Sequence, residues 1–258
     1  MKSKGGWTAL ALLDIKNVYK TYSDSNRSLT VIEDISFSIA KGEFVCLVGP
    51  SGSGKSTILR MVVGLDKPSQ GSIFYRGEQV NGVMDKMAIV FQSFALLPWL
   101  TVMGNVVLGL EAKGIPRVER EKIARKYIDK VGLDGFEEAY PRELSRGMKQ
   151  RVGIARALTV EPELLCMDEP FSGLDAFTAQ NLREELLDLW LDTSLPVKSV
   201  LMVTHGIEEA VFMADRVIVF SKRPAKIIAD VKIELPRPRN MKDEAFAKVT
   251  DKIYSLLF

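Results

Sequence analysis

Short runs of consecutive apolar residues recur along the chain, and amphipathic helical patterns lie between them. The run before Gly49 and the run that ends at Met167 are apolar throughout, which is typical of parallel strands covered on both faces. This alternation of strands with helices predicts a doubly wound α/β core. The runs that we predict as strands are Phe44–Val48, Met87–Phe91, Leu164–Met167, Ser199–Val203 and Arg216–Phe220.

One region of the pattern is mostly helical. The segment PRVEREKIARKYIDKV, residues 116–131, has proline in its first turn and apolar residues at helical spacing, and Gly132 ends it. Together with the signals up to Leu158, it predicts a helical insertion of about 60 residues within the α/β core.

The last part of the chain has its own pattern. Arg223–Leu235 predicts a short pair of strands, and PRPR, Pro236–Arg239, predicts a stiff linker. Asp243–Leu257 has the pattern of a closing amphipathic helix, with Phe246 and Ile253 on its apolar face.

The N-terminal segment MKSKGGWTALALLD loosely imitates a secretion signal, with two lysines before an apolar patch. Asp14 and the alternating LDIKNVYKTY fit a first β-strand better, so we expect no signal peptide and a cytosolic chain. The net charge of +2 gives no overall bias toward nucleic acid or anionic lipid. Cys46 and Cys166 lie in apolar runs and are expected to be buried thiols, and two cysteines with one histidine cannot complete a zinc site without carboxylates.

From Met87 to Leu110 the chain carries no charged side chain, although 26% of the protein is charged. A helix of that length would be about 36 Å long, enough to cross a bilayer. Pro98 would break such a helix near its centre, and polar groups such as Gln92 and Asn105 would be costly in lipid. We therefore expect no transmembrane segment here.

The segment GPSGSGKST connects the strand FVCLV to a helical pattern and matches the phosphate-loop motif G-x-x-x-x-G-K-[ST]. A glycine-rich loop presents several backbone N–H groups to phosphate, and the following helix adds its positive end. Lys55 is expected to reach the β- and γ-phosphates of ATP and Ser56 to ligate Mg²⁺, whereas a merely flexible turn is the alternative. The predicted ATP-binding residues of this loop are Gly49, Pro50, Ser51, Gly52, Ser53, Gly54, Lys55, Ser56 and Thr57.

Two acids and one histidine follow further strands. Asp168 ends an apolar strand and is expected to hold Mg²⁺ through water, and Glu169 is placed to orient or deprotonate the attacking water. His205, the only histidine, follows VLMVT and is predicted to bond near the γ-phosphate. The alternatives are two ordinary loop acids and a structural histidine.

These elements in this order resemble the ATP-binding subunit of an ABC transporter, over nearly the whole chain. ELSRGMKQR, Glu143–Arg151, is similar to the family signature, and SGLD, Ser172–Asp175, is similar to the loop after the catalytic carboxylate. Gln92 falls where the family has its Q-loop glutamine, and Tyr22 where an aromatic ring stacks on adenine. No N-K-x-D motif for guanine is present in the sequence.

The resemblance implies a single ATP-binding domain over residues 1–258. Its fold would be a RecA-like P-loop NTPase core with a mostly parallel sheet and an antiparallel β edge. The helical signature subdomain would occupy about residues 95–158, and a C-terminal tail would occupy residues 222–258.

The resemblance also implies a head-to-tail dimer, as a homodimer or with a paired ATPase subunit, that closes on two ATP molecules with Mg²⁺. Gln92 and Asp168 would join Ser56 around the metal, and Asp175 would lie at the dimer interface. The signature residues that would meet the partner's ATP are Ser145, Arg146, Gly147 and Met148.

LLPWLTVMGNV and RPAKIIADVKIELPRPR resemble the branch that imports nitrate, sulfonates, taurine and related solutes. That branch implies integral membrane permeases, an extracytoplasmic solute-binding protein and a peripheral place on the cytoplasmic face of the membrane. Leu96–Leu100, with Trp99 as an anchor, would contact the permease, unless these side chains pack within the helical subdomain. The alternative function is the ATPase of an exporter or lipid-handling complex. An ATPase acting on DNA or ribosomes is a further class, against which the chain lacks coiled-coil arms, paired cassettes and a large basic face.

Two positions depart from the family pattern. Arg146 replaces the first of two glycines after the signature serine, where a cation at a helix start is disfavoured by about 0.3–1 kcal/mol. The hypothesis is a charge-assisted contact across the dimer, and the alternatives are a weakened signature or an arginine turned to solvent. Gly206 replaces the usual aspartate after His205, which leaves the anchoring of the histidine loop open.

Overall fold

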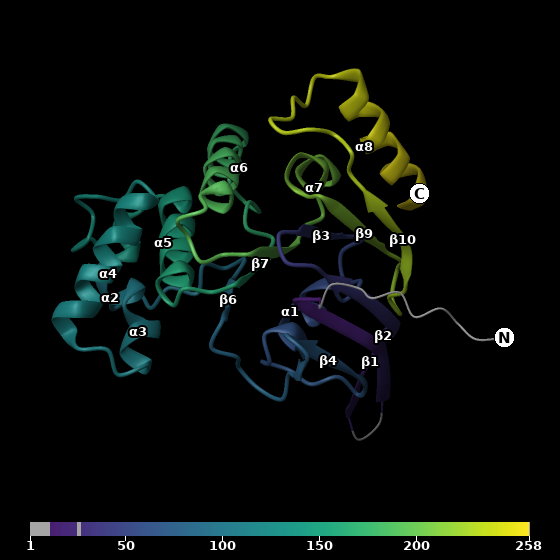
Figure 1. Ribbon diagram of the computed structural model, residues 1–258, viewed down its shortest axis with the longest axis horizontal. Coiled ribbons are helices and arrows are strands. Elements are labelled where there is room, and N and C mark those ends of the chain that lie inside the picture. Colours follow the sequence, from purple (N-terminus) through teal and green to yellow (C-terminus); the bar gives the residue numbers. More distant parts are fainter. Residues whose placement is uncertain (1–10, 25–26, 258) are drawn as a thin grey trace. The chain divides into compact units, whose positions relative to one another are not determined.

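The computed structural model describes residues 11–24 and 27–257, and the chain divides into two compact units (Figure 1). The first unit comprises Met1–Val83 and His205–Phe258, and the second comprises Met84–Thr204. The N-terminal segment considered as a secretion signal lies mostly outside the described residues. The predicted first strand is present from Leu13.

The first unit contains an antiparallel sheet and a second group of strands. The sheet has the order β2-β1-β4-β5, with β1 antiparallel to both β2 and β4. In the second group, β3 runs parallel to β9, and β10 runs antiparallel to β9. These strands are β1 (Leu13–Asp24), β2 (Arg27–Ile39), β3 (Phe44–Val48), β4 (Gln70–Tyr75), β5 (Glu78–Gln79), β9 (Arg216–Phe220) and β10 (Ile227–Lys232).

Three helices complete this unit: α1 (Lys55–Val62), α7 (Ile207–Met213) and α8 (Glu244–Leu257). In Figure 1, α8 lies beside α7, β9 and β10, consistent with its contacts to all three elements. Every residue of β3 is buried, as its continuous apolar run predicts.

The second unit contains three parallel strands and most of the helices. The strands β6 (Met87–Val90), β7 (Leu164–Asp168) and β8 (Ser199–Val203) pair in that order, and β7 and β8 are buried throughout. Helices α2 to α5 pack on one another, as Figure 1 shows. The helices are α2 (Val102–Val106), α3 (Leu108–Ala112), α4 (Arg117–Lys130), the 3₁₀ turn η1 (Pro141–Glu143), α5 (Arg146–Thr159) and α6 (Ala176–Leu191).

The predicted strands agree with the structure to within one residue at each end. The predicted helix over residues 116–131 is α4, with Pro116 and Val131 as its cap residues and Gly132 at φ 66° after it. The uncharged run from Met87 forms β6, a turn and the short helices α2 and α3. Among the described residues, no helix combines the length and apolar character needed to cross a membrane.

One prediction for the last part of the chain is wrong. Arg223–Leu235 does not form a pair of strands, because it contains a single strand, β10, that pairs with β9. PRPR does connect β10 to α8, but Arg237 and Arg239 also donate to carbonyl groups at the end of α7. The partners of both segments lie earlier in the sequence, where a local pattern cannot show them.

Candidate functional site

The phosphate-loop sequence forms a tight turn between β3 and α1, and its backbone requires glycine. Gly49, Gly52 and Gly54 have φ values of 157°, 75° and 91°. A Cβ at Gly49 would lie 2.8 Å from the carbonyl oxygen of Phe220, and one at Gly54 would lie 2.8 Å from Cγ1 of Val31. A Cβ at Gly52 would meet nothing within 4 Å. The loop therefore packs against Phe220 at one end and Val31 at the other, and the space beside Gly52 is open. A loop of this kind can present backbone N–H groups to an anion.

Lys55 lies within the curve of this loop. Its side chain belongs to a residue only 4% exposed, and its Nζ donates hydrogen bonds to the carbonyl oxygens of Gly49 (2.8 Å) and Pro50 (3.0 Å). The ammonium group is thus held at the start of α1, where the helix N-terminus also carries partial positive charge. A loop with these donors fits the phosphates of a nucleotide.

Tyr22 belongs to a small polar cluster in the same unit. Its hydroxyl donates to Asp66 at 2.8 Å, and Nζ of Lys20 lies 4.7 Å from the centre of its ring. Lys20 also donates to Asp66 (2.5 Å) and to the carbonyl oxygen of Lys67 (2.7 Å). Partial burial, with the hydrogen bond to Asp66, raises the pKa of Tyr22. The phenol is therefore neutral at physiological pH, and its ring is held by its hydroxyl while the residue remains 43% exposed.

Sequence reasoning predicted Tyr22 but missed Lys20 and Asp66. The alternation of the first strand gives no sign that a lysine in it would be buried, and Lys20 is 8% exposed. The spacing of Lys20 and Tyr22 could have indicated that Lys20 lies beside the tyrosine, since residues two apart on a strand lie on the same face.

In the second unit, Glu169 and Gln92 are in direct contact. Nε2 of Gln92 donates to Oε2 of Glu169 at 2.9 Å and lies 3.4 Å from Oγ of Ser172. Glu169 has a backbone φ of 45°, and its N–H donates to the carbonyl oxygen of Val203. A left-handed conformation is unusual for glutamate, and the surrounding structure holds this residue in it. The structure thus joins two residues that the sequence placed 77 positions apart.

Asp168 is the last residue of β7 and is buried. Its position at the C-terminal end of a parallel strand agrees with the sequence analysis. Glu169 follows directly, but its carboxyl group has a different environment. Asp168 belongs to the buried strand, whereas Glu169 belongs to the loop and contacts Gln92.

The signature segment begins α5 as predicted. Ser145 is the N-cap, and its hydroxyl accepts from the N–H of Met148 at 3.2 Å. A Cβ on Gly147 would lie 2.6 Å from Cγ2 of Thr178, so only glycine fits there. Asp175 caps α6 by accepting from the N–H of Thr178 (3.0 Å). Hydrogen bonds from the side chain and the backbone of Thr178 lower the pKa of Asp175.

Arg146 is exposed, and it also makes a hydrogen bond that was not predicted from the sequence. Its Nη1 donates to the carbonyl oxygen of Gly173 at 3.0 Å, within the same chain. Gly173 belongs to the SGLD loop and has a φ of 72°. The arginine therefore connects the start of α5 to the loop after Glu169. A contact between Arg146 and a partner's ATP stays a prediction.

His205 is an exposed residue immediately before α7, and Gly206 is the N-cap of that helix. A Cβ on Gly206 would lie 3.1 Å from Cδ of Glu209 and 3.2 Å from its Oε2. The side chain of Glu209 therefore lies beside the space that an aspartate at position 206 would enter.

The donors predicted for Mg²⁺ fit its chemistry, since the ion prefers hydroxyl, carboxylate and water oxygens together with phosphates. Among the residues that the structure describes, no group of three or more His, Cys, Asp or Glu side chains could hold a metal ion.

Comparison with known proteins identifies the family. Residues 32–172 match the family model described as "ABC transporter". The chain belongs to the ABC transporter family. The nitrate import ATP-binding protein NrtD of Synechocystis sp. is 45% identical over 254 residues, covering 95% of this chain and 94% of its own length. The aliphatic sulfonates import ATP-binding protein SsuB of Bacillus cereus is 40% identical, covering 93% of this chain and 94% of its own.

A solved structure supports the same assignment. The dimeric, post-hydrolysis structure of the ATP-binding cassette MJ0796, bound to ADP and Pi, superposes with a TM-score of 0.76 at 33% identity. It covers 87% of this chain and all of its own. The chain is an ATP-binding ABC protein with ATPase activity, and the predicted fold class, a P-loop α/β core with an inserted group of helices, is confirmed.

Proposed function

We propose that this ABC ATPase is the energy-coupling subunit of an import system for a small anion. The observation that carries the proposal is the similarity, over more than nine-tenths of each chain, to proteins named for the import of nitrate and of aliphatic sulfonates. Both solutes are small anions. Two short segments of the chain, LLPWLTVMGNV and RPAKIIADVKIELPRPR, resemble the same branch, and taurine, an aminosulfonate, is included in the proposal with them.

In the proposed reaction the phosphate loop, residues 49–57, binds the phosphates of ATP. Its backbone N–H groups and Lys55 contact the phosphate oxygens, and Tyr22 stacks on adenine with the face not covered by Lys20. Ser56, Gln92 and Asp168 are assigned to the magnesium site. When bound, Mg²⁺ neutralises charge that develops on the β- and γ-phosphates.

Glu169 is proposed to accept a proton from the attacking water, and His205 to bond to the γ-phosphate as it leaves. The contact between Gln92 and Glu169 supports this role, because a general base must be held in one orientation. The positive φ of Glu169 supports it as well, since strained backbone is concentrated at functional sites. The proposal requires these residues and the phosphate loop to act on one nucleotide.

A second ATPase subunit completes the proposed site. Ser145, Arg146, Gly147 and Met148 are assigned to the partner's ATP, and Asp175 to the dimer interface. The support is that the similar cassette MJ0796 is a dimer bound to ADP and Pi. The start of α5 also offers N–H groups at a helix N-terminus, which favours phosphate.

The proposed contact with the membrane permease is the segment Leu96–Leu100. Trp99 is 69% exposed, while Leu96, Leu97 and Leu100 are half-buried. The segment is held in place by Asn105, a buried residue whose Oδ1 accepts from the N–H of Leu97 and whose Nδ2 lies within hydrogen-bond distance of the carbonyl oxygens of Leu97, Leu100 and Thr101. A large aromatic side chain presented on a fixed turn is a suitable anchor for a protein partner. The proposed complex lies on the cytoplasmic face of the membrane, with an extracytoplasmic solute-binding protein.

The test is transport by the assembled complex. The chain is purified with its permease and solute-binding protein, reconstituted in proteoliposomes and assayed for ATPase activity with nitrate, taurine and an alkanesulfonate. We expect one of these anions to raise turnover several-fold, and Lys55→Ala to abolish both the basal and the stimulated activity. Stimulation only by a hydrophobic or cationic compound, or export in place of uptake, would contradict the proposal.

A further inference from the structure

The helix that follows His205 is short. It has seven residues, Ile207–Met213, and its N-cap residue is Gly206, which has no side chain that could accept a capping hydrogen bond. An isolated helix of two turns is unstable in water and depends on contacts with the rest of the protein. Whatever holds α7 therefore also determines where His205 lies.

The C-terminal end of α7 is bonded by two arginines of the segment PRPR. The last carbonyl groups of a helix have no partner within it, and they require donors from elsewhere. Nη1 of Arg239, which has two hydrogens, donates to the carbonyl oxygens of Val211 (2.6 Å) and Ala214 (2.6 Å) and lies 3.2 Å from that of Phe212. Nη2 of Arg237 donates to the carbonyl oxygen of Met213 (2.5 Å). Four consecutive carbonyl groups thus lie within hydrogen-bond distance of two guanidinium groups.

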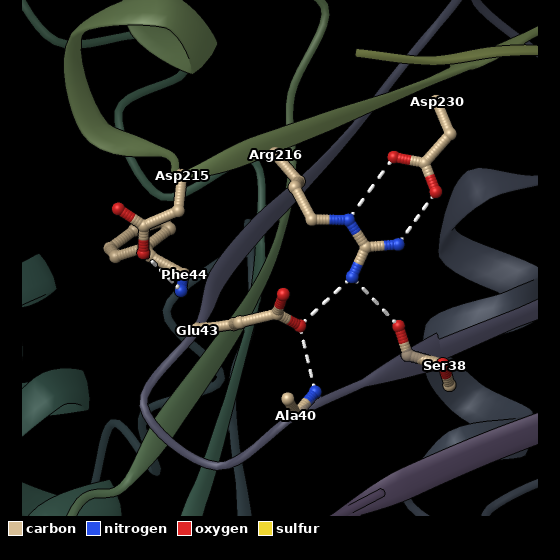
Figure 2. Close-up of polar contacts among 7 residues, drawn as sticks. All are labelled: Ser38, Ala40, Glu43, Phe44, Asp215, Arg216 and Asp230. Carbon is tan, nitrogen blue, oxygen red and sulfur yellow. Dashed lines mark hydrogen bonds and ion pairs between the residues drawn. The ribbon is translucent and has the colours of Figure 1, made fainter. Parts of the chain in front are cut away.

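Both arginines are fixed by further contacts. Arg239 is only 8% exposed, and its Nε donates to the carbonyl oxygen of Leu235. Burial, together with the nearby charge of Arg237, lowers the pKa of Arg239 to about 10, so the group stays cationic at neutral pH. Arg237 also donates to Asp215 at 2.5 Å, and Asp215 accepts from the N–H of Phe44, a contact visible in Figure 2. Two cations at the negative end of a helix interact favourably with its dipole.

The first turn of α7 is also bonded to the tail. The hydroxyl of Tyr254, on α8, donates to Oε1 of Glu208 at 2.9 Å. Helix α8 packs against α7, and its buried residues include Phe246 and Ile253. The tail therefore contacts both ends of the helix that follows His205.

We infer that Arg239 and Arg237 are positioning residues for His205, and that the C-terminal tail is therefore required for full ATPase activity. The two guanidinium groups hold α7 at its C-terminal end. An aspartate at position 206 could have capped the N-terminal end, but Gly206 cannot. This inference rests on the role proposed for His205 in hydrolysis, but its structural half is measurable without ATP.

The experiment uses the single histidine of the chain as its reporter. The full-length protein, labelled with ¹⁵N at histidine, is compared with Arg239→Met by the imidazole signals in NMR. The matched control is Arg216→Met. Arg216 donates to Asp230, on the tail strand β10, and to Glu43 and the carbonyl oxygen of Ser38, and none of these partners belongs to α7 (Figure 2). Steady-state ATPase kinetics and thermal unfolding are recorded for each protein.

We expect Arg239→Met to shift or broaden the His205 signals and to lower kcat about tenfold, with KM for ATP within about twofold of the unaltered chain. Arg216→Met is expected to lower the unfolding temperature but to leave the His205 signals and kcat in place. Arg239→Lys, which keeps the charge with fewer donors, should lie between. If Arg239→Met does not fold, the milder Tyr254→Phe decides, since it removes only the hydroxyl bound to Glu208 and should still shift the His205 signals.

Two results would overturn the inference. One is that the His205 signals of Arg239→Met, or of Tyr254→Phe where Arg239→Met does not fold, superpose on those of the unaltered chain. The other is that Arg216→Met shifts these signals equally. A shift of the signals with full ATPase activity would separate the two claims. It would show that the tail positions His205 and that His205 has no part in hydrolysis, which would overturn the catalytic half of the inference. His205→Ala, assayed in parallel, would confirm that reading by retaining full turnover.

Discussion

Helices α1 and α7 have eight and seven residues, and each follows a loop assigned to the ATPase site, yet their C-terminal ends are stabilised in different ways. Helix α1 ends in a local motif: the N–H of Leu65 donates to the carbonyl oxygen of Arg60, and that of Gly64 to Met61, with Gly64 at φ 76°. At the C-terminal end of α7, three of the four contacts to carbonyl groups come from Arg239, which is 25 or more positions away in the sequence.

The difference shows what each loop depends on. The helix after the phosphate loop is closed by its own glycine, so this part of the site is built within about 20 residues. The helix after His205 is completed only when the end of the chain folds onto it. A change in the tail can therefore reach His205 without altering the phosphate loop.

The largest effect in this comparison is expected for Gly64→Ala. A Cβ at Gly64 would lie 2.0 Å from the carbonyl oxygen of Gly82, and the backbone is left-handed there. We expect the free energy of unfolding to fall by about 3 kcal/mol or more, measured by urea titration. Gly42→Ala is the control, because its φ is also positive but its Cβ would meet nothing within 4 Å. A cost of about 1–2 kcal/mol is expected for it, and equal losses in both variants would show that the close approach of Gly82 to Gly64 adds nothing to the cost.

A smaller effect is expected for Lys20→Met. Asp66, which follows the Gly64–Leu65 ending of α1, accepts from both Lys20 and the hydroxyl of Tyr22. Loss of the lysine removes the cation beside the ring and loosens its orientation, so we expect the affinity for ATP to fall about fivefold. Equilibrium titration with ATP would measure it. Lys16→Met is a matched control, since Lys16 lies 4.9 Å from the ring of Phe74 and bonds to Asp14. Unchanged affinity in Lys20→Met would contradict the role of the cluster.

The smallest effect is expected from giving α7 a local cap. Gly206→Asp alone would bring its carboxylate against the side chain of Glu209, so we combine it with Glu209→Ala. An aspartate N-cap contributes about 1 kcal/mol to a helix. In that background Arg239→Met should cost about 0.5–1 kcal/mol less stability than in the unaltered chain, as a double-mutant cycle by urea unfolding would measure. The same cost in both backgrounds would show that the two ends of α7 are not coupled.

The same contrast explains how much could be predicted from the sequence. The strand, loop and helix around Lys55 were predicted within a residue or two, because apolar runs and glycines act locally. The burial of Cys46 and Cys166 was also predicted correctly. These features depend on neighbours in the sequence or on hydrophobicity alone.

The contacts that were missed are between residues far apart in sequence. Lys20 and Asp66 are 46 positions apart, and Arg146 reaches Gly173 across 27. The segment PRPR was read as a linker because two prolines indicate stiffness, but its arginines are determined by carbonyl groups that only the folded chain presents. Side-chain to backbone contacts of this kind leave no periodic signal.

The most direct test of the account is hydrolysis by Glu169→Gln. Glutamine keeps an oxygen that can accept from Gln92 but cannot take a proton from water, so we expect ATP to bind with unchanged affinity. Single-turnover hydrolysis should be slower by about a hundredfold or more, with Glu119→Gln on the exposed side of α4 as the unaffected control. Cleavage of bound ATP by Glu169→Gln at the rate of the unaltered chain would contradict the proposed site.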